Sequence, residues 1–156
     1  MKKIIPLLLA LTILGGEVIY VHFLSKRADR VATLRRQLKD ANALIRGSAA
    51  HQLGTLGYRE DAITEFVKLL ENETPSIRWR ALNGLGELSA KEAMPLIMKH
   101  LTDKDADVRW HVVKMLGSLG IKEAVPEIEK LLTDEDRLVR DHAKYALKKL
   151  RNSDYK

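Results

Sequence analysis

The chain contains no cysteine among its 156 residues, and only four prolines and two phenylalanines. The lack of cysteine excludes disulfides, thiolate metal sites, cysteine nucleophiles and a lipid-modified cysteine anchor. Alternating apolar and polar runs, which would indicate β-strands, are nearly absent. At this length the chain can bury the core of one domain with an extension. These features together indicate an all-α protein.

Motifs of common catalytic and cofactor sites are also missing. The chain has no glycine-rich phosphate loop, no G-x-S-x-G elbow and no H-E-x-x-H. His111 and His142 stand one repeat apart, and a metal could bridge them, but no further ligand converges on the pair. We therefore expect no metal site, no cofactor and no enzymatic activity.

What the sequence does contain is a self-match at a spacing of 31 residues through its last hundred positions. Three segments align without a gap, and a weaker fourth copy lies upstream at a spacing of 32. The shared positions are leucines and arginines: Leu70, Leu101 and Leu132; Arg78, Arg109 and Arg140; Leu88, Leu119 and Leu150. Such a period indicates stacked units, none of which can bury its apolar face alone.

Each unit has the pattern of a helix, a short polar turn, a second helix and a turn that contains glycine in two units. The second helices are preceded by residues that favour the N-cap, namely Asn42, Thr74, Asp105 and Asp136. Gly57 and Gly120 mark the turns that close two of the units. We expect a repeat domain over residues 30–151, divided into 30–57, 58–88, 89–119 and 120–150, and a polar tail over 152–156.

Two strings make the repeat specific. E-A-x-P-x-I-x-x-x-L-x-D at 92–103 and V-R-x-x-x-x-x-x-L-G-x-L-G at 108–120 resemble the short HEAT repeat named after phycocyanobilin lyases. The resemblance covers about residues 30–150. It implies an all-α, right-handed superhelical solenoid of three to four repeats, with the second helices on the concave side. It also implies a structural ladder of hydrogen bonds between neighbouring turns, formed by Arg78, Asp103, Arg109, Asp134 and Arg140.

The N-terminus is strongly apolar. Two lysines precede a run from Ile4 to Leu24 that carries one charge, Glu17, and about 20 apolar residues suffice to cross a bilayer. A cleaved signal peptide is the alternative, but Gly15 and Gly16 lack a small residue two positions earlier. We expect residues 1–25 to form an uncleaved transmembrane helix, with weak self-association between two such spans as a secondary contact.

Positive charge is concentrated directly after this apolar run. Residues 58–156 carry 18 basic and 18 acidic side chains, whereas residues 26–46 carry seven basic and two acidic ones. The neutral repeats argue against nucleic acid as a partner. The positive-inside rule places the repeats on the cytoplasmic side, and export after signal cleavage is the alternative. The residues expected at the membrane surface are Lys26, Arg27, Arg30, Arg35 and Arg36.

The exposed side of the second helices carries aromatic and charged residues at equivalent positions. The predicted partner-binding residues are Trp79, Arg80, Asn83, Trp110, His111, Lys114, His142 and Tyr145. Trp, Tyr and Arg are the residue types enriched in binding hot spots. Alternatively the tryptophans pack between neighbouring helices, and both roles can coexist.

These observations favour a membrane-tethered scaffold that binds a protein or peptide partner through its concave helix face. The alternative is an enzyme like the bilin lyases, or an accessory subunit that loads a chromophore. That alternative depends only on the name of the repeat, and a fold by itself does not determine a function.

Overall fold

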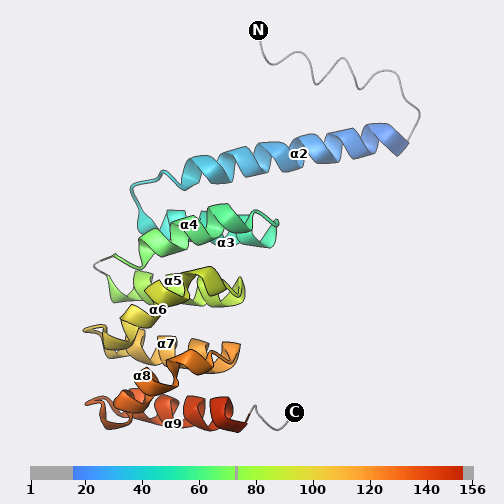
Figure 1. Cartoon of the computed structure of the whole chain (residues 1–156). Helices are drawn as coiled ribbons and strands as arrows, with labels where there is room; N and C mark the ends of the chain where they lie inside the picture. Colours follow the sequence, from blue (N-terminus) through green and yellow to red (C-terminus); the bar gives the residue numbers. More distant parts are fainter. Residues whose placement is uncertain (1–15, 73, 153–156) are drawn as a thin grey trace.

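The computed structural model describes residues 16–72 and 74–152, and every regular element in these ranges is helical. The helices follow one another as α2 (Gly16–Gln37), α3 (Ala43–Thr55), α4 (Arg59–Leu69), α5 (Pro75–Glu87), α6 (Met94–Lys99), α7 (Ala106–Leu119), α8 (Val125–Lys130) and α9 (Arg137–Asn152). Short 3-10 turns flank α6 and α8: Lys91–Ala93, His100–Thr102, Lys122–Ala124 and Leu131–Thr133. The helices stack in pairs (Figure 1), so the predicted all-α solenoid of helical repeats is confirmed.

The second helices of the pairs, α3, α5, α7 and α9, form one layer and contact each other in sequence order. The helices α4, α6 and α8 form the other layer, and the core lies between the two. Equivalent leucines of the second helices, Leu53, Leu85 and Leu116, are fully buried there. Repeats of this kind bury their apolar faces against their neighbours, so we expect the stack and not the single repeat to be the stable unit.

Side-chain caps start three of the four second helices. Asn42 and Asp105 accept hydrogen bonds from backbone N–H groups of the first helical turn, at 2.9 and 3.3 Å. Asp136 does the same at 2.8 and 3.1 Å. Thr74 makes no such bond. There Pro75 occupies the first turn, where its missing N–H leaves no donor unsatisfied.

The turns after the second helices need a left-handed residue. Gly57 and Gly120 have φ of 90° and 69°, as their positions in the repeat predict. The equivalent residue in the unit between them is Ser89, which adopts φ of 48°. All three turns close with the same backbone hydrogen bond, at 2.9–3.0 Å. The N–H of the residue after the turn residue donates to the carbonyl oxygen five positions earlier, as Tyr58 does to Leu53. Ser89 therefore bears a strain that glycine avoids.

We expect Ser89→Gly to raise the free energy of unfolding by about 0.5–1 kcal/mol, because it removes the left-handed strain of a residue with a Cβ. Gly120→Ala is the reciprocal control and should lower it, since an added Cβ meets nothing within 4 Å and only the backbone conformation opposes it. Urea unfolding followed by circular dichroism measures both. Equal stability of Ser89→Gly and the wild type would contradict this account.

The first helix is longer than the sequence predicts for one element. Residues 4–15 of the expected span lie outside the described residues, and from Gly16 onwards the chain runs as one helix to Gln37. The expected membrane helix and basic segment are thus not separated by a break near residue 25. Within the described ranges, no helix combines the length and the apolar character needed to cross a membrane.

The C-terminal half of α2 takes the place of a first helix in the solenoid. Val31 and Leu34 are each 4% exposed and pack with Ala49 and Leu53 of α3. The N-terminal half projects past the end of the stack (Figure 1), so its face towards the repeats has no helix beneath it.

Candidate partner-binding site

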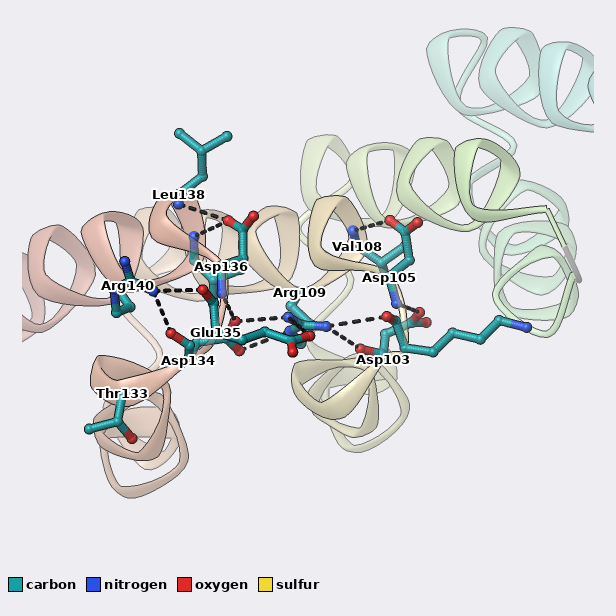
Figure 2. Close-up of polar contacts among 12 residues, drawn as sticks. Asp103, Asp105, Val108, Arg109, Thr133, Asp134, Glu135, Asp136, Leu138 and Arg140 are labelled. Carbon is teal, nitrogen blue, oxygen red and sulfur yellow. Dashed lines mark hydrogen bonds and ion pairs between the residues drawn. The ribbon is translucent and has the colours of Figure 1, made fainter.

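Buried arginine–aspartate pairs join neighbouring repeats, and Figure 2 shows the pair of Arg109 and Asp134. Arg109 Nη2 lies 2.8 Å from Asp134 Oδ1, and its Nε lies 2.9 Å from Asp134 Oδ2. Arg78 holds Asp103 with the same two nitrogens, at 2.6 and 2.9 Å. All four side chains are at most 8% exposed. Such bidentate pairs fix both the position and the orientation of the two side chains.

Each arginine also binds the turn of its own repeat. Arg109 Nη1 donates to the carbonyl oxygen of Asp103 at 2.9 Å, and Arg140 Nη1 donates to that of Asp134 at 2.6 Å. The carboxylate of Asp103 in turn accepts the backbone N–H of Asp105 at 3.0 Å. One guanidinium therefore connects the turn of its own repeat to the turn of the next, as Figure 2 shows.

The ladder changes at its two ends. Asn72 stands where the other repeats have aspartate, and Arg46 instead donates from Nε to Glu65 Oε1 at 2.7 Å. Glu65 is 3% exposed, so it supplies from α4 the buried carboxylate that the turn lacks. Arg140 belongs to the final repeat, and its hydrogen bonds within the described residues go to the carbonyls of its own turn.

We expect Arg109→Ala to cost about 3–5 kcal/mol of unfolding free energy, because it leaves Asp134 buried without its charge partner. Arg140→Ala is the matched control: it removes contacts to two carbonyls and no buried pair, and should cost about 1 kcal/mol. Urea titration of both variants gives the comparison. Similar losses of unfolding free energy in the two variants would show that the ion pair between repeats adds no cost beyond that of the carbonyl contacts.

The ladder carboxylates are held in their charged form. Burial alone would raise the pKa of Asp103, but hydrogen bonds from Arg78, the Asp105 N–H and His100 outweigh it, and the pKa lies below its usual value. Burial likewise opposes charge on Asp134, but the hydrogen bonds from Arg109 and the Asp136 N–H, together with the charges of Arg109 and Arg140, outweigh it, so the pKa of Asp134 is also lowered. Both residues therefore bind protons less readily in the folded state than in the unfolded chain.

This difference predicts acid sensitivity of a definite sign. The two carboxylates stabilise the fold above their unfolded pKa of about 3.9, and the stabilisation is lost as pH falls through their lower folded-state values. Urea unfolding between pH 6 and pH 3 should show a falling free energy below roughly pH 4.5. Asp103→Asn should flatten that dependence, whereas Asn at the exposed Asp29 should not. An unchanged slope in Asp103→Asn would refute the assignment.

Four rings from α5, α7 and α9 form a continuous stack, here called the aromatic stack. The ring centroids of Trp79 and His111 lie 4.8 Å apart, with 18° between the ring planes. His111 lies 3.6 Å from Trp110, and Trp110 lies 4.8 Å from His142. Trp79 and Trp110 also pack against the core. Both tryptophans thus pack between neighbouring helices, as the alternative interpretation of the sequence predicted.

Polar contacts hold the aromatic stack in place. Trp110 Nε1 donates to Asp107 Oδ1 at 2.9 Å. His111 Nδ1 lies 2.5 Å from the Asp107 carbonyl oxygen, which can only accept, so Nδ1 carries the proton. Burial, with the nearby charge of Lys114, lowers the pKa of His111. The ring is therefore neutral near pH 7.

Two cations lie over this stack. Arg80 lies above Trp79, with 5.5 Å from its guanidinium carbon to the ring centroid, and Lys114 Nζ lies 5.8 Å from the centroid of Trp110. Neither Arg80 nor Lys114 has a carboxylate partner in the part of the chain that the structure describes. This part of the surface thus presents aromatic faces and positive charge together.

A groove of about 270 Å³ opens beside the stack, between α3 and α5. Its lining combines apolar and polar residues: Ala43, Leu44, Gly47, Ser48, His51, Phe66, Leu69, Ile77, Arg80, Ala81, Asn83, Gly84 and Glu87. Gly47 occupies the repeat position of Trp79 and Trp110. The stack therefore stops at α5, and the space that a third tryptophan would fill stays open.

Glycine is required at the floor of the groove. The Phe66 ring is 4% exposed and lies under α5 at Gly84. A Cβ on Gly84 would lie 2.3 Å from Phe66 Cζ, which is closer than atoms can pack. Towards the end of α3, His51 Nδ1 and Glu87 Oε2 face each other across the groove at 3.2 Å. A second hollow of about 200 Å³ continues beyond them.

The structure brings the predicted binding residues together only in part. Asn83 lines the groove with Arg80. It also lines a further hollow between α5 and α7, together with His111 and Lys114. Tyr145 is 68% exposed on α9, apart from the aromatic stack. The sequence interpretation missed Gly47, Phe66 and Gly84. A glycine in the column of the tryptophans was the signal that could have identified the groove.

The residues predicted at the membrane surface are partly engaged with the repeats. Arg27 donates to the Leu56 carbonyl at 2.9 Å, and Arg30 donates to Gln52 Oε1 at 3.2 Å. Arg35 lies 2.8 Å from Asp61 Oδ2. These contacts fasten α2 to the first repeats. Lys26 and Arg36 are exposed and make no ion pair among the described residues.

His111 and His142, the candidate metal pair, flank Trp110 in the stack. Across residues 16–72 and 74–152, no three His, Cys, Asp or Glu side chains are grouped as metal ligands.

Comparison with known proteins identifies the repeat. The family pattern described as HEAT repeats matches residues 63–148. The chain is similar in structure to human deoxyhypusine hydroxylase in complex with glycerol, with a TM-score of 0.66 and 20% identity over 84% of the chain. It is also similar to the complex of CpcE and CpcF of phycocyanin lyase from Nostoc sp. PCC7120, with a TM-score of 0.51 and 19% identity over 78%. No curated protein sequence matches the chain.

The chain spans 47% of the hydroxylase structure and 65% of the lyase structure. At these identities the similarity shows the fold alone.

Proposed function

The chain belongs to the HEAT-repeat family, and we propose that it acts as a scaffold whose second helices hold a segment of a partner protein. The observation that carries the proposal is the groove between α3 and α5, which has an apolar floor at Phe66 and lies beside the aromatic stack. Stacked repeats of this kind offer extended surfaces for binding.

The chemistry of the groove suggests what the partner segment contains. An apolar side chain would enter over Phe66, in the position that tryptophan fills in the following repeats. Arg80 lies at the rim over one tryptophan ring, and Lys114 lies over another, one repeat further on. Neither cation has a carboxylate partner among the described residues. An acidic residue next to the apolar side chain would complement them. A short amphipathic helix with acidic residues meets both requirements.

We further propose that the apolar N-terminus tethers the scaffold to a membrane, with the repeats on the cytoplasmic side. The support is the apolar run from Ile4 to Leu24 and the basic residues that follow it. The hydrogen bonds of Arg27 and Arg30 to α3 would hold the repeats close to that surface.

The alternative of a bilin lyase-like enzyme or a chromophore-loading subunit is supported by the fold similarity alone. We prefer partner binding because the groove over Phe66 and the cation Arg80 at its rim support it.

A photo-crosslinking amino acid at Ser48, in the groove, should capture a partner segment in cells, whereas the same group at Lys104, in a turn, should not. The captured segment, made as a peptide, then serves as the probe for affinity. Gly47→Trp should weaken its binding about 30-fold or more, corresponding to about 2 kcal/mol, because the ring fills the groove.

The matched control is Gly47→Ala, whose Cβ would lie at an ordinary 3.5 Å from Leu69 Cδ1 and leave the groove open. Both substitutions remove a helical glycine, so neither should unfold α3. Retained affinity in Gly47→Trp, together with an unchanged melting temperature, would overturn the groove as the binding site.

A further inference from the structure

The face of α2 towards the repeats is longer than the helix that it packs on. α2 has 22 residues, whereas α3, on which it packs, has 13. Val31 and Leu34 are covered by α3, but α3 ends at Thr55. On the same side of α2, Phe23 is 61% exposed and lines a hollow with Thr55 and Leu56, at that end of α3. The core-facing side of α2 thus continues into a surface that the repeats do not cover.

This surface forms a hollow of about 400 Å³ at the end of α3, here called the shelf. Its lining residues are Phe23, Lys26, Arg27, Arg30, Thr55 and Leu56. Three of the six are cations and none is acidic. Asp29 is the nearest acidic residue of α2 in sequence, and it does not line the shelf.

The cations of the shelf keep hydrogen-bonding capacity. Arg27 and Arg30 each use Nη2 to bind the repeats, at Leu56 and Gln52, so both guanidinium groups are held in place. Their other nitrogens make no hydrogen bond that the described residues account for, and Lys26 is exposed. Fixed guanidinium groups bind a phosphate oxygen with less loss of side-chain freedom than flexible ones.

We propose that the shelf binds the headgroup of an anionic phospholipid, with the first part of its acyl chain against Phe23 and Leu56. Apolar stems with cationic ends match an amphiphile that is apolar at one end and negatively charged at the other. Phe23 and Leu24 end the apolar run that precedes the cations, so the shelf begins where that run meets water. The inference rests on the proposed membrane tether.

The test reconstitutes the full chain into phosphatidylcholine nanodiscs with a trace of spin-labelled phosphatidylglycerol or spin-labelled phosphatidylcholine. Electron paramagnetic resonance measures the fraction of each label that is motionally restricted by the protein. A roughly fivefold preference for phosphatidylglycerol is expected, the factor that corresponds to about 1 kcal/mol for one well-placed cation.

The decisive variant moves one charge without changing the net charge. Lys26→Ala with Ala28→Lys moves a cation only about 3 Å along α2 but turns it about 200° around the helix, away from the shelf. The preference should fall at least about twofold. Lys39→Ala, which removes an exposed cation in the turn after α2, outside both the shelf and the residues expected at the membrane surface, should leave the preference unchanged. An unchanged preference in the relocation variant would mean that charge alone attracts the lipid, and would overturn the shelf.

Inorganic phosphate, compared with chloride at equal ionic strength, distinguishes the two sources of a phosphate group. The lipid preference should persist, because free phosphate lacks the chain that contacts Phe23; its loss would reassign the shelf to a free phosphate and overturn the lipid. Failure of the full chain to enter nanodiscs would overturn the tether and the shelf together. Entry without a preference would overturn the shelf alone.

Discussion

The guanidinium group at the start of each second helix is the contact on which the stacking of the repeats depends. Arg78 and Arg109 bind carbonyls of their own turns and the aspartates of the next turns, so each joins two repeats at a fixed angle. A buried ion pair adds little net stability compared with apolar residues of the same size, because desolvation offsets the attraction. We infer that the ladder instead selects one stacking geometry, since a shifted register would leave buried charges unpaired.

The proposed binding face follows from that register. With α5, α7 and α9 fixed, Trp79, His111, Trp110 and His142 overlap into one stack. Gly47 interrupts the pattern on α3, and the groove is the result. Arg46 keeps the adjoining step in place through Glu65, although Asn72 has replaced the ladder aspartate. In an otherwise regular stack, this single deviation at Gly47 thus produces the groove that we propose as the binding site.

The repeat period predicted the solenoid because buried leucines and turn residues recur wherever a unit must pack on its neighbours. Gly57 and Gly120 could be recognised as turn residues for the same reason, since their positive φ values favour glycine. The order of the rings in the stack was not readable, because it depends on side-chain directions that a column of equivalent positions does not specify. The sequence analysis placed Trp79 and Trp110 next to each other, but His111 lies between them. The spacing of 32 residues from Trp79 to His111, repeated from Trp110 to His142, could have indicated this order. The contacts of Arg27 and Arg30 were missed because charge near an apolar run indicates a membrane surface as readily as a hydrogen bond.

Distance measurement across the stack tests the role of the ladder most directly. The chain has no cysteine, so spin labels can be placed at Thr55→Cys on α3 and Lys149→Cys on α9. Three helix-to-helix steps separate these equivalent positions, about 25–30 Å in total, which double electron–electron resonance can resolve. The account predicts one narrow distance distribution in the otherwise unchanged protein and a broadened one when Arg78→Met removes a ladder pair while helicity is retained. A distribution of the same width and centre in Arg78→Met would contradict the claim that the ladder fixes the stacking.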